Sequence, residues 1–382
     1  MRDIFIDSPK ALTELCHTLR NSSWLALDTE FIREKSYYPR LCLLQVANEE
    51  LVACIDPLAL PDLAELFSVI YDSGITKVFH AGRQDLEIFY YLHGELPQPL
   101  FDTQIAAALL GYGDQIGYGA LVKVMLDVEL PKAHSRTDWA LRPLEQEQIR
   151  YAADDVRYLR QLYGVQRQQL EELGRLEWLA DDFAFLADPR TYENPPQQAW
   201  SRVKGFHHLK GQQLAVLQAL AGWREERARK IDKPRKWLLR DDVLLELARR
   251  QPKNHQALAK IRGLDTGFVR TYGAEMLALI RSAQSLPEGQ WPRPAKKVRL
   301  SAEQEGIVDV MMAMVRLVAI DNQISPASLV TRKELERLVA GEQDTPVMKG
   351  WRGELCGGLL RDFLDGRIAL RMDEGRLAHR MV

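Results

Sequence analysis

Cysteine is scarce in this chain of 382 residues, which contains four: Cys16, Cys42, Cys54 and Cys356. No two of them form a CxxC pair, and three lie inside apolar runs. This distribution argues against a structural zinc site or a framework of disulfides, and it favours a reducing compartment.

Long apolar runs are also missing. The most apolar helical stretch, residues 308–320, is interrupted by Arg316 and is too short to span a bilayer. The first ten residues, MRDIFIDSPK, carry charges where a signal peptide needs an apolar stretch. We therefore expect a soluble, cytoplasmic protein without a membrane partner.

No charge of one sign dominates, because the formal net charge is only -2. The whole-chain balance therefore neither favours nor excludes a nucleic-acid partner, and local clusters of charge must decide. The hydrophobic fraction of 46% and the charged fraction of 27% are typical of a globular protein. The length predicts two or three domains.

Strand and helix patterns alternate in the first part of the chain. Short runs rich in Leu, Val and Ile predict strands at 24–31, 41–47, 51–57 and 75–81. Helical patterns cover 11–20, 85–94, 101–113 and about 145–173. This order predicts an α/β fold in which a mixed sheet is flanked by helices.

The strand pattern stops near residue 200, and amphipathic helices are predicted at 212–230, 240–250 and 272–284. A proline-rich stretch without helical period follows, and a second helical region comes after it. Arg224, Pro234 and Arg240 recur at the same spacing as Arg316, Pro326 and Arg332, which favours two related helical domains. We expect a first domain over 1–170, a connecting segment over 171–207, helical domains over 208–288 and 301–375, and a linker over 289–300.

Two acids stand at the end of an apolar strand, in WLALDTEF at residues 24–31. Asp28 and Glu30 are two residues apart, so a strand directs both side chains to the same face. Burying paired carboxylates is costly, which calls for an explanation. The simple alternative is a solvated strand end with Glu30 facing water.

More acids follow at other predicted element ends. Asp85 comes after a strand and a glycine turn, where binding sites collect in α/β sheets, although an ordinary helix start also favours an acid there. Tyr151 and Asp155 are four apart and share one helix face, which also fits a tyrosine at the edge of the core. Asp154 is turned away by about 100°, and we expect it to be structural or solvated. Asp102 is interpreted as a helix cap.

Asp28, Glu30, Asp85 and Asp155 would repel one another if gathered in one place, so such a cluster persists only with cations. Carboxylate oxygens suit Mg²⁺ and Mn²⁺. Two such ions can clamp the attacking and leaving oxygens of a phosphodiester. The acids therefore predict a site for two ions, Mg²⁺ or Mn²⁺, with Asp28 as the best candidate to bridge them.

The segments that carry these residues resemble the three exonuclease motifs of the DEDD superfamily: DTEF at 28–31, FHAGRQDLEIF at 79–89 and YAADDVRYL at 151–159. Tyr151, four residues before Asp155, matches the tyrosine branch of that superfamily. The stretch 135–159 closely resembles the ribonuclease D family. Residues 217–248 resemble an HRDC domain, and 302–372 look like a more diverged second copy.

The resemblance implies an RNase H-like fold for about residues 1–170, followed by two all-α HRDC-type domains. It implies a metal-dependent 3'-5' exoribonuclease that releases 5'-mononucleotides and trims the 3' ends of tRNA precursors and other structured-RNA tails. It assigns catalysis to Asp28, Glu30, Asp85, Tyr151 and Asp155, with the four acids as metal ligands. Since a tyrosine pKa of about 10 makes a poor base at neutral pH, we expect Tyr151 to orient the attacking water.

A basic cluster with two tryptophans lies at residues 223–237, which hold seven Lys and Arg residues. Such groups neutralise phosphates, and tryptophan faces stack bases. The candidate phosphate contacts are Arg227, Arg229, Lys230, Arg235 and Lys236. The alternative is a solvated helix face paired with Glu225 and Glu226, and we expect Trp223 and Trp237 to be core residues.

Phe31 and His80 flank the acidic motifs, and we expect them to touch the terminal nucleotide. RNA with a single-stranded 3' end is the expected partner, and the protein is expected to be a monomer. Two other functions stay open at this point. One is a DNA exonuclease of the same superfamily, because the motifs do not read the 2'-OH. The other is a catalytically silent RNA-binding scaffold, although a dead site has no reason to keep repelling carboxylates.

Overall fold

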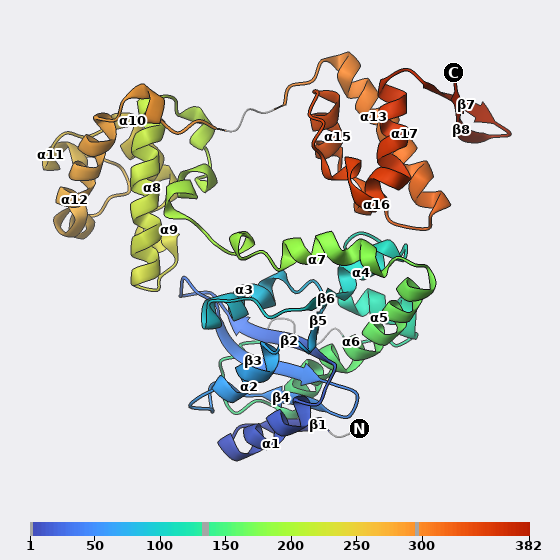
Figure 1. Cartoon of the computed structure of the whole chain (residues 1–382). Helices are drawn as coiled ribbons and strands as arrows, with labels where there is room; N and C mark the ends of the chain where they lie inside the picture. Colours follow the sequence, from blue (N-terminus) through green and yellow to red (C-terminus); the bar gives the residue numbers. More distant parts are fainter. Residues whose placement is uncertain (1–2, 132–136, 295–297) are drawn as a thin grey trace.

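A mixed sheet of six strands forms the centre of the N-terminal α/β domain (Figure 1). The structure is a computed structural model that describes residues 3–131, 137–294 and 298–382. The strands are β1 (Asp3–Ile6), β2 (Trp24–Ile32), β3 (Arg40–Ala47), β4 (Val52–Ile55), β5 (Thr76–Phe79) and β6 (Leu100–Asp102). Their order is β1-β4-β3-β2-β5-β6, in which β2, β3 and β4 are antiparallel and the other pairs are parallel.

Helices cover both faces of this sheet. One face packs against α1 (Pro9–Leu19), α2 (Ala64–Ile70) and α3 (Arg83–His93). The other packs against α4 (Thr103–Leu109) and α6 (Gln146–Glu172), with α5 (Tyr118–Leu126) against α4 and α6. In β2, Leu25 and Leu27 belong to the first core and Ala26 to the second. Strand alternation therefore places Asp28 and Glu30 on the side of α6.

The four predicted strands are present, and the prediction of a mixed sheet flanked by helices is confirmed. The prediction of a helix over 101–113 is wrong at both ends. Phe101 and Asp102 pair with β5 as part of strand β6, and α4 ends at Leu109. Strand β1 and helix α2 lie outside every predicted element. Both are short, and short elements give little periodicity to detect.

Two helical bundles follow the α/β domain (Figure 1). After α7 (Ala180–Leu186), the first bundle contains α8 (Gln212–Lys230), α9 (Arg235–Leu238), α10 (Asp241–Arg250), α11 (His255–Leu258) and α12 (Thr266–Gln284). The second contains α13 (Ala302–Asp321), α14 (Pro326–Leu329), α15 (Arg332–Val339), α16 (Gly350–Arg352) and α17 (Gly358–Leu364). An antiparallel hairpin of β7 (Ile368–Asp373) and β8 (Arg376–Met381) ends the chain, so the prediction of an all-α final domain needs this correction.

The predicted repeat appears as a shared order of a long helix, a four-residue helix after or at a proline, and a third helix. The matched arginines differ in their surroundings. Arg224 is buried and donates to the Leu239 carbonyl and to Asp241, both at 2.8 Å, whereas Arg316 is exposed. The two bundles therefore share an outline and not a set of interactions.

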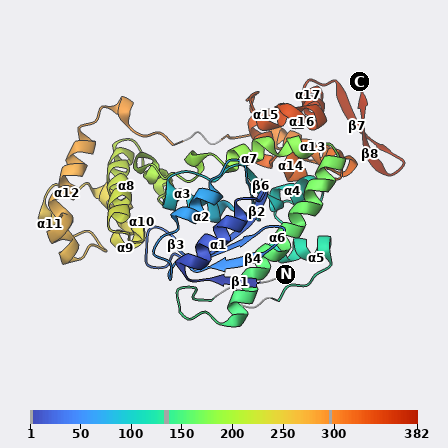
Figure 2. The same ribbon diagram turned by 60° about the horizontal axis from the view of Figure 1, so that its bottom comes forward.

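Each bundle contacts the α/β domain at its own place, and the two bundles lie apart in both views (Figures 1 and 2). The Tyr37 hydroxyl donates to the buried Glu225 of α8, and the Tyr37 amide donates to Asp232 at 2.9 Å. Trp351 of the second bundle stacks on Trp178, with ring centroids 4.6 Å apart. The two hydrogen bonds of Tyr37 position the first bundle beside the end of β2.

Several other predictions are tested by the described residues. All four cysteines are buried and free. Every helix in the described ranges falls short of the length or apolarity that a membrane span requires. Residues 295–297 of the predicted linker and residues 135–136 of the motif at 135–159 lie outside the described residues.

Candidate active site

A cavity of about 470 Å³ opens where β2 ends, beside the start of α3 and one face of α6. It is lined by the five residues predicted to be catalytic: Asp28, Glu30, Asp85, Tyr151 and Asp155. Phe31 and His80, the two residues expected to touch the terminal nucleotide, line it as well. The fold thus brings together residues that are more than 100 positions apart in the sequence.

Three carboxylates meet closely in this cavity. Asp28, Glu30 and Asp155 each offer an oxygen, and these oxygens lie within 4.8 Å of one another. β2 supplies the first two from one face, and α6 crosses that face to supply the third. A set of three carboxylate oxygens at this spacing suits a hard divalent cation.

Asp85 lines the same cavity but does not belong to this group of three. It lies in the first turn of α3, and the Thr29 hydroxyl donates a hydrogen bond to its carboxylate. Thr29 is the residue between the two acids of β2, so its side chain points to the opposite face of the strand, toward α3. The predicted set of four acids is therefore three gathered carboxylates and a fourth held by a threonine.

The pKa values of all four carboxyls are raised. Burial and then the charges of its acidic neighbours raise the pKa of Asp28 well above its ordinary value. The same causes raise the pKa of Glu30 to about 8 and, with Asp154 as the first neighbour, that of Asp155 to about 7. Burial raises the pKa of Asp85 to about 6, against the lowering effect of the Thr29 hydrogen bond. A bound cation would reverse these shifts, because it favours the charged form of each carboxyl.

Tyr151 lies one turn before Asp155 on α6, as the spacing predicted. Its ring stacks near Trp139, with centroids 6.4 Å apart and planes 30° apart. Burial and then the nearby acids, Asp155 first, raise the pKa of Tyr151 to about 12. The hydroxyl therefore keeps its proton at neutral pH and is able to donate a hydrogen bond.

Tyr118 is a site residue that the sequence analysis did not identify. It lines the cavity, and its hydroxyl donates to the backbone carbonyls of Asp154, at 2.9 Å, and Asp155. It also makes an edge-to-face contact with His80, whose ring nitrogens lie 2.9 Å from the Thr103 hydroxyl and 3.1 Å from the Ile116 carbonyl. Burial lowers the pKa of His80, so this ring is neutral at pH 7.

The acids interpreted as structural have structural roles. Asp102 caps α4 by accepting from the amides of Gln104, at 2.8 Å, and Ile105, at 3.3 Å. Asp154 pairs with Arg157 at 2.7 Å and does not line the cavity.

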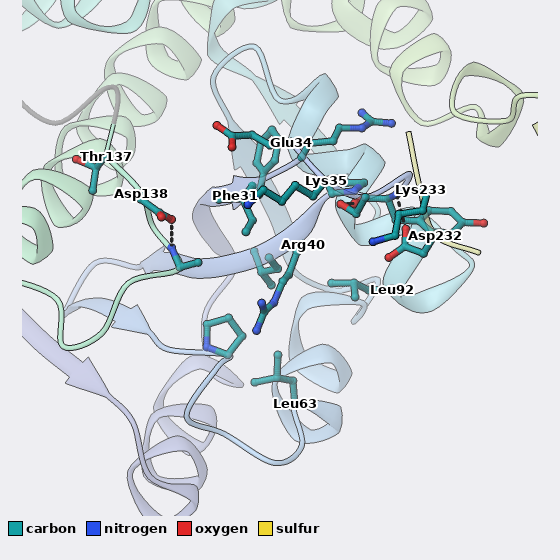
Figure 3. Close-up of a pocket in the computed structure, with 18 of the residues that line it drawn as sticks. Phe31, Glu34, Lys35, Arg40, Leu63, Leu92, Thr137, Asp138, Asp232 and Lys233 are labelled. Carbon is teal, nitrogen blue, oxygen red and sulfur yellow. Dashed lines mark hydrogen bonds between the residues drawn. The ribbon is translucent and has the colours of Figure 1, made fainter. Parts of the chain in front are cut away.

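Phe31 also borders a second and larger cavity of about 1150 Å³, which we call the 31–41 cavity after the segment that forms most of its wall (Figure 3). Residues of the first helical bundle close one side of it, where Asp232 and Lys233 are drawn in Figure 3. A register shift between Glu30 and Phe31 separates the paired acids from this wall. Phe31 thus stands between the acid cluster and the 31–41 cavity.

The predicted phosphate contacts fall into two groups. Arg227 lies over the Tyr272 ring and Arg229 donates to the Tyr37 hydroxyl at 3.1 Å, so both already have partners within the chain. Lys230 is exposed, and Arg235 and Lys236 line a groove between α9 and the start of α3.

Trp223 is buried, as expected, against Phe268 and Tyr272. The prediction of a core position is wrong for Trp237, whose exposed fraction is 63%. α9 has four residues, and the two leucines that directly follow Trp237, Leu238 and Leu239, face the bundle core in its place.

Comparisons with known proteins match the α/β domain and the first helical bundle to two known families. Residues 4–171 match a 3'-5' exonuclease domain family, and residues 213–280 match the HRDC domain family. Ribonuclease D of Gluconacetobacter diazotrophicus is 39% identical over 377 residues, which is 98% of this chain and 96% of that protein. Ribonuclease D of Bartonella henselae is 37% identical over 364 residues, which is 94% of this chain and 89% of that protein.

A solved structure is similar over nearly the whole chain. The crystal structure of Escherichia coli RNase D, an exoribonuclease involved in structured RNA processing, gives a TM-score of 0.82 at 35% identity. The match covers 96% of this chain and 99% of that one.

Proposed function

Since the chain belongs to the ribonuclease D family of 3'-5' exoribonucleases, we propose that its cluster of Asp28, Glu30 and Asp155 is the metal-dependent site that hydrolyses RNA 3' ends. The single observation that carries this proposal is the approach of three carboxylate oxygens to within 4.8 Å in one cavity. Such an arrangement is unfavourable without a cation, and it costs free energy that a structural role would not require.

We propose that Asp28, Glu30 and Asp155 hold two divalent ions, Mg²⁺ or Mn²⁺, with Asp85 contributing to one of them. The raised pKa values of these carboxyls support this, because they reflect burial and then mutual repulsion, and a cation would offset both. When bound, such ions stabilise negative charge on a phosphodiester and make water a stronger nucleophile at neutral pH.

The remaining residues of the cavity position the reactants. Tyr151 donates its hydroxyl proton in a hydrogen bond and so orients the attacking water, and its pKa of about 12 excludes it as the base at pH 7. Tyr118 fixes the backbone of α6 beneath Asp155. Phe31 presents an aromatic edge or face to the terminal base at the mouth of the cavity.

The finer substrate proposal is the 3' end of tRNA precursors and other structured-RNA tails, with release of 5'-mononucleotides in the cytoplasm by a monomer. Support comes from the Escherichia coli relative, which is involved in structured RNA processing.

Degradation of a 5'-labelled single-stranded RNA with Mg²⁺ or Mn²⁺ tests the proposal. We expect the wild-type protein to shorten the RNA stepwise from its 3' end, and Asp28→Asn to be slower by about 1000-fold. Asp7→Asn, a change of an exposed acid away from the cavity, is the matched control and should retain activity. Equal degradation by wild type and Asp28→Asn would refute the assignment. A matched DNA strand hydrolysed faster than the RNA would favour the alternative of a DNA exonuclease.

A further inference from the structure

A groove of about 670 Å³ lies between the start of α3 and α9 of the first helical bundle. We call it the α9 groove, and the lining residues that matter here are Arg33, Arg83, Gln84, Arg235, Lys236 and Trp237. Arg83 and Gln84 also line the active-site cavity, so the two hollows are neighbours that meet at the first turn of α3. A chain that leaves the acid cluster therefore has a path toward α9.

The groove carries an excess of positive charge. Among the residues that the structure describes, its charged lining has four cations and one acid, Glu87. Arg33 neutralises Glu87 at 2.8 Å, and Arg235 pairs with the buried Glu225 at 3.2 Å. The Arg83 side chain makes no hydrogen bond or ion pair within the described ranges, and Lys236 lies 3.9 Å from Asp241. Arg83 and Lys236 are exposed, and the contact of the Lys236 ammonium with Asp241 is long for an ion pair, so these two cations are the most available to a polyanion.

Trp237 stands at the rim of this groove. Its exposed fraction of 63% contrasts with 8% for Trp223 in the same bundle. The Trp237 amide donates to the Pro234 carbonyl at 2.8 Å, which holds the short turn of α9 and its outward-facing ring in place. Exposing the apolar ring of a tryptophan to water costs free energy, and an exposed tryptophan is a common stacking platform for unpaired bases.

We propose that single-stranded RNA on the 5' side of the terminal nucleotide lies in the α9 groove, with a base stacked on Trp237 and phosphates against Arg83 and Lys236. This inference rests on the proposed function, because it takes the acid cluster as the place of the 3' end. It predicts a selectivity for unpaired tails. A base in a duplex is already stacked and paired, so a helix that reaches the groove gives Trp237 no free face and stops the shortening.

The 31–41 cavity is the rival path (Figure 3). It is larger, but Phe31 is the only described residue that it shares with the active-site cavity. The charges of its described lining nearly balance, because that lining includes three acids: Glu34, Asp138 and Asp232. Its basic residues are Arg33, Lys35, Arg40 and Lys233. A phosphate backbone therefore gains less there than in the α9 groove.

The path is tested by measuring how the full-length protein binds a 5'-fluorescein-labelled 12-nucleotide oligo(A). A chelator is present, so that binding is measured without catalysis. We expect Trp237→Ala to weaken binding by about tenfold and Trp237→Phe by less than about threefold. Lys236→Ser should reduce the dependence of binding on salt by about one ion. Lys233→Ser, which changes an exposed lysine of the rival cavity, is the matched control and should bind as wild type does.

Hydrolysis of the dinucleotide pApA with Mn²⁺ is measured beside it. Lys233→Ser should hydrolyse pApA as fast as wild type does, because it changes neither the acid cluster nor the α9 groove. Wild-type affinity of Trp237→Ala for oligo(A), or an equal loss in Lys233→Ser, would overturn the proposed path. Failure of every variant and of wild type to hydrolyse pApA would instead contradict the proposed function, and the binding result would still report on the groove.

Discussion

Replacing Glu30 by Gln should stabilise the metal-free protein, and more so as the pH rises. The carboxyl of Glu30 is partly buried beside Asp155 and Asp85, and these surroundings raise its pKa from 4.5 to about 8. Between these two values the folded protein keeps a proton that the unfolded chain has already released. The free energy of unfolding of the wild type therefore falls as the pH rises through this window.

The size of the effect follows from the same pKa values. Each pKa unit corresponds to about 1.4 kcal/mol, so the charged carboxyl costs the folded state up to roughly 5 kcal/mol at pH 8 or above. Gln does not titrate and cannot contribute this slope. The difference in unfolding free energy between Glu30→Gln and wild type should therefore grow by about 2 kcal/mol between pH 6 and pH 8.

Urea denaturation of chelator-treated protein at pH 6, 7 and 8 measures this difference. Glu34→Gln is the matched control, because Glu34 is an exposed acid four residues later and outside the group of three carboxylates. We expect its difference from wild type to be the same at each pH. Saturating Mn²⁺ should remove most of the pH slope of the wild type, because a cation favours the charged carboxyl. It should stabilise Glu30→Gln much less.

If the free energies of unfolding of wild type and Glu30→Gln depend on pH in the same way, this reasoning is refuted. Such a result would mean that a charge on Glu30 does not destabilise the folded protein. Full stabilisation of Glu30→Gln by Mn²⁺ would separately remove Glu30 from the ligand set.

Two other substitutions test the positioning of groups around the cluster. Tyr151→Phe should lower kcat by about 100-fold and leave KM nearly unchanged. Tyr158→Phe on the same helix is the control and should keep both constants. Steady-state hydrolysis of RNA measures kcat and KM for each variant. Trp351→Ala removes the ring stacked on Trp178 and the hydrogen bond of 3.0 Å to its carbonyl. It should weaken the docking of the second bundle by about 2 kcal/mol and raise the radius of gyration in solution scattering, and an unchanged radius would show that other contacts suffice.

The acids of the site were predictable because local geometry decides which way they point. A period of two residues places Asp28 and Glu30 on one face of a strand, and a spacing of four places Tyr151 above Asp155 on a helix. The costs of gathering carboxylates then favoured a cation site. The mixed sheet followed in the same way from the lengths and order of the apolar runs.

Other features depend on contacts between segments that are far apart in the sequence, and a local sequence pattern cannot predict such contacts. The Thr29 hydroxyl holds Asp85 because α3 packs on the opposite face of β2. Tyr118 reaches α6 from a glycine-rich segment that has no strong periodicity. Trp237 lies in a helix of four residues, too short for a period to distinguish its buried side from its exposed side. Strands β1 and β6 are likewise too short to show a period in the sequence. Their pairing with β4 and β5 defines them as strands.

The claim that the acids of β2 and α6 exist to hold catalytic ions is tested most directly by anomalous scattering from crystals grown with Mn²⁺ and a hydrolysis-resistant RNA. We predict two Mn²⁺ peaks within ligand distance of Asp28, Glu30, Asp85 and Asp155, and a loss of at least one peak in Asp28→Asn. Mn²⁺ found only elsewhere on the protein, with RNA bound and no peak among these carboxylates, would contradict it.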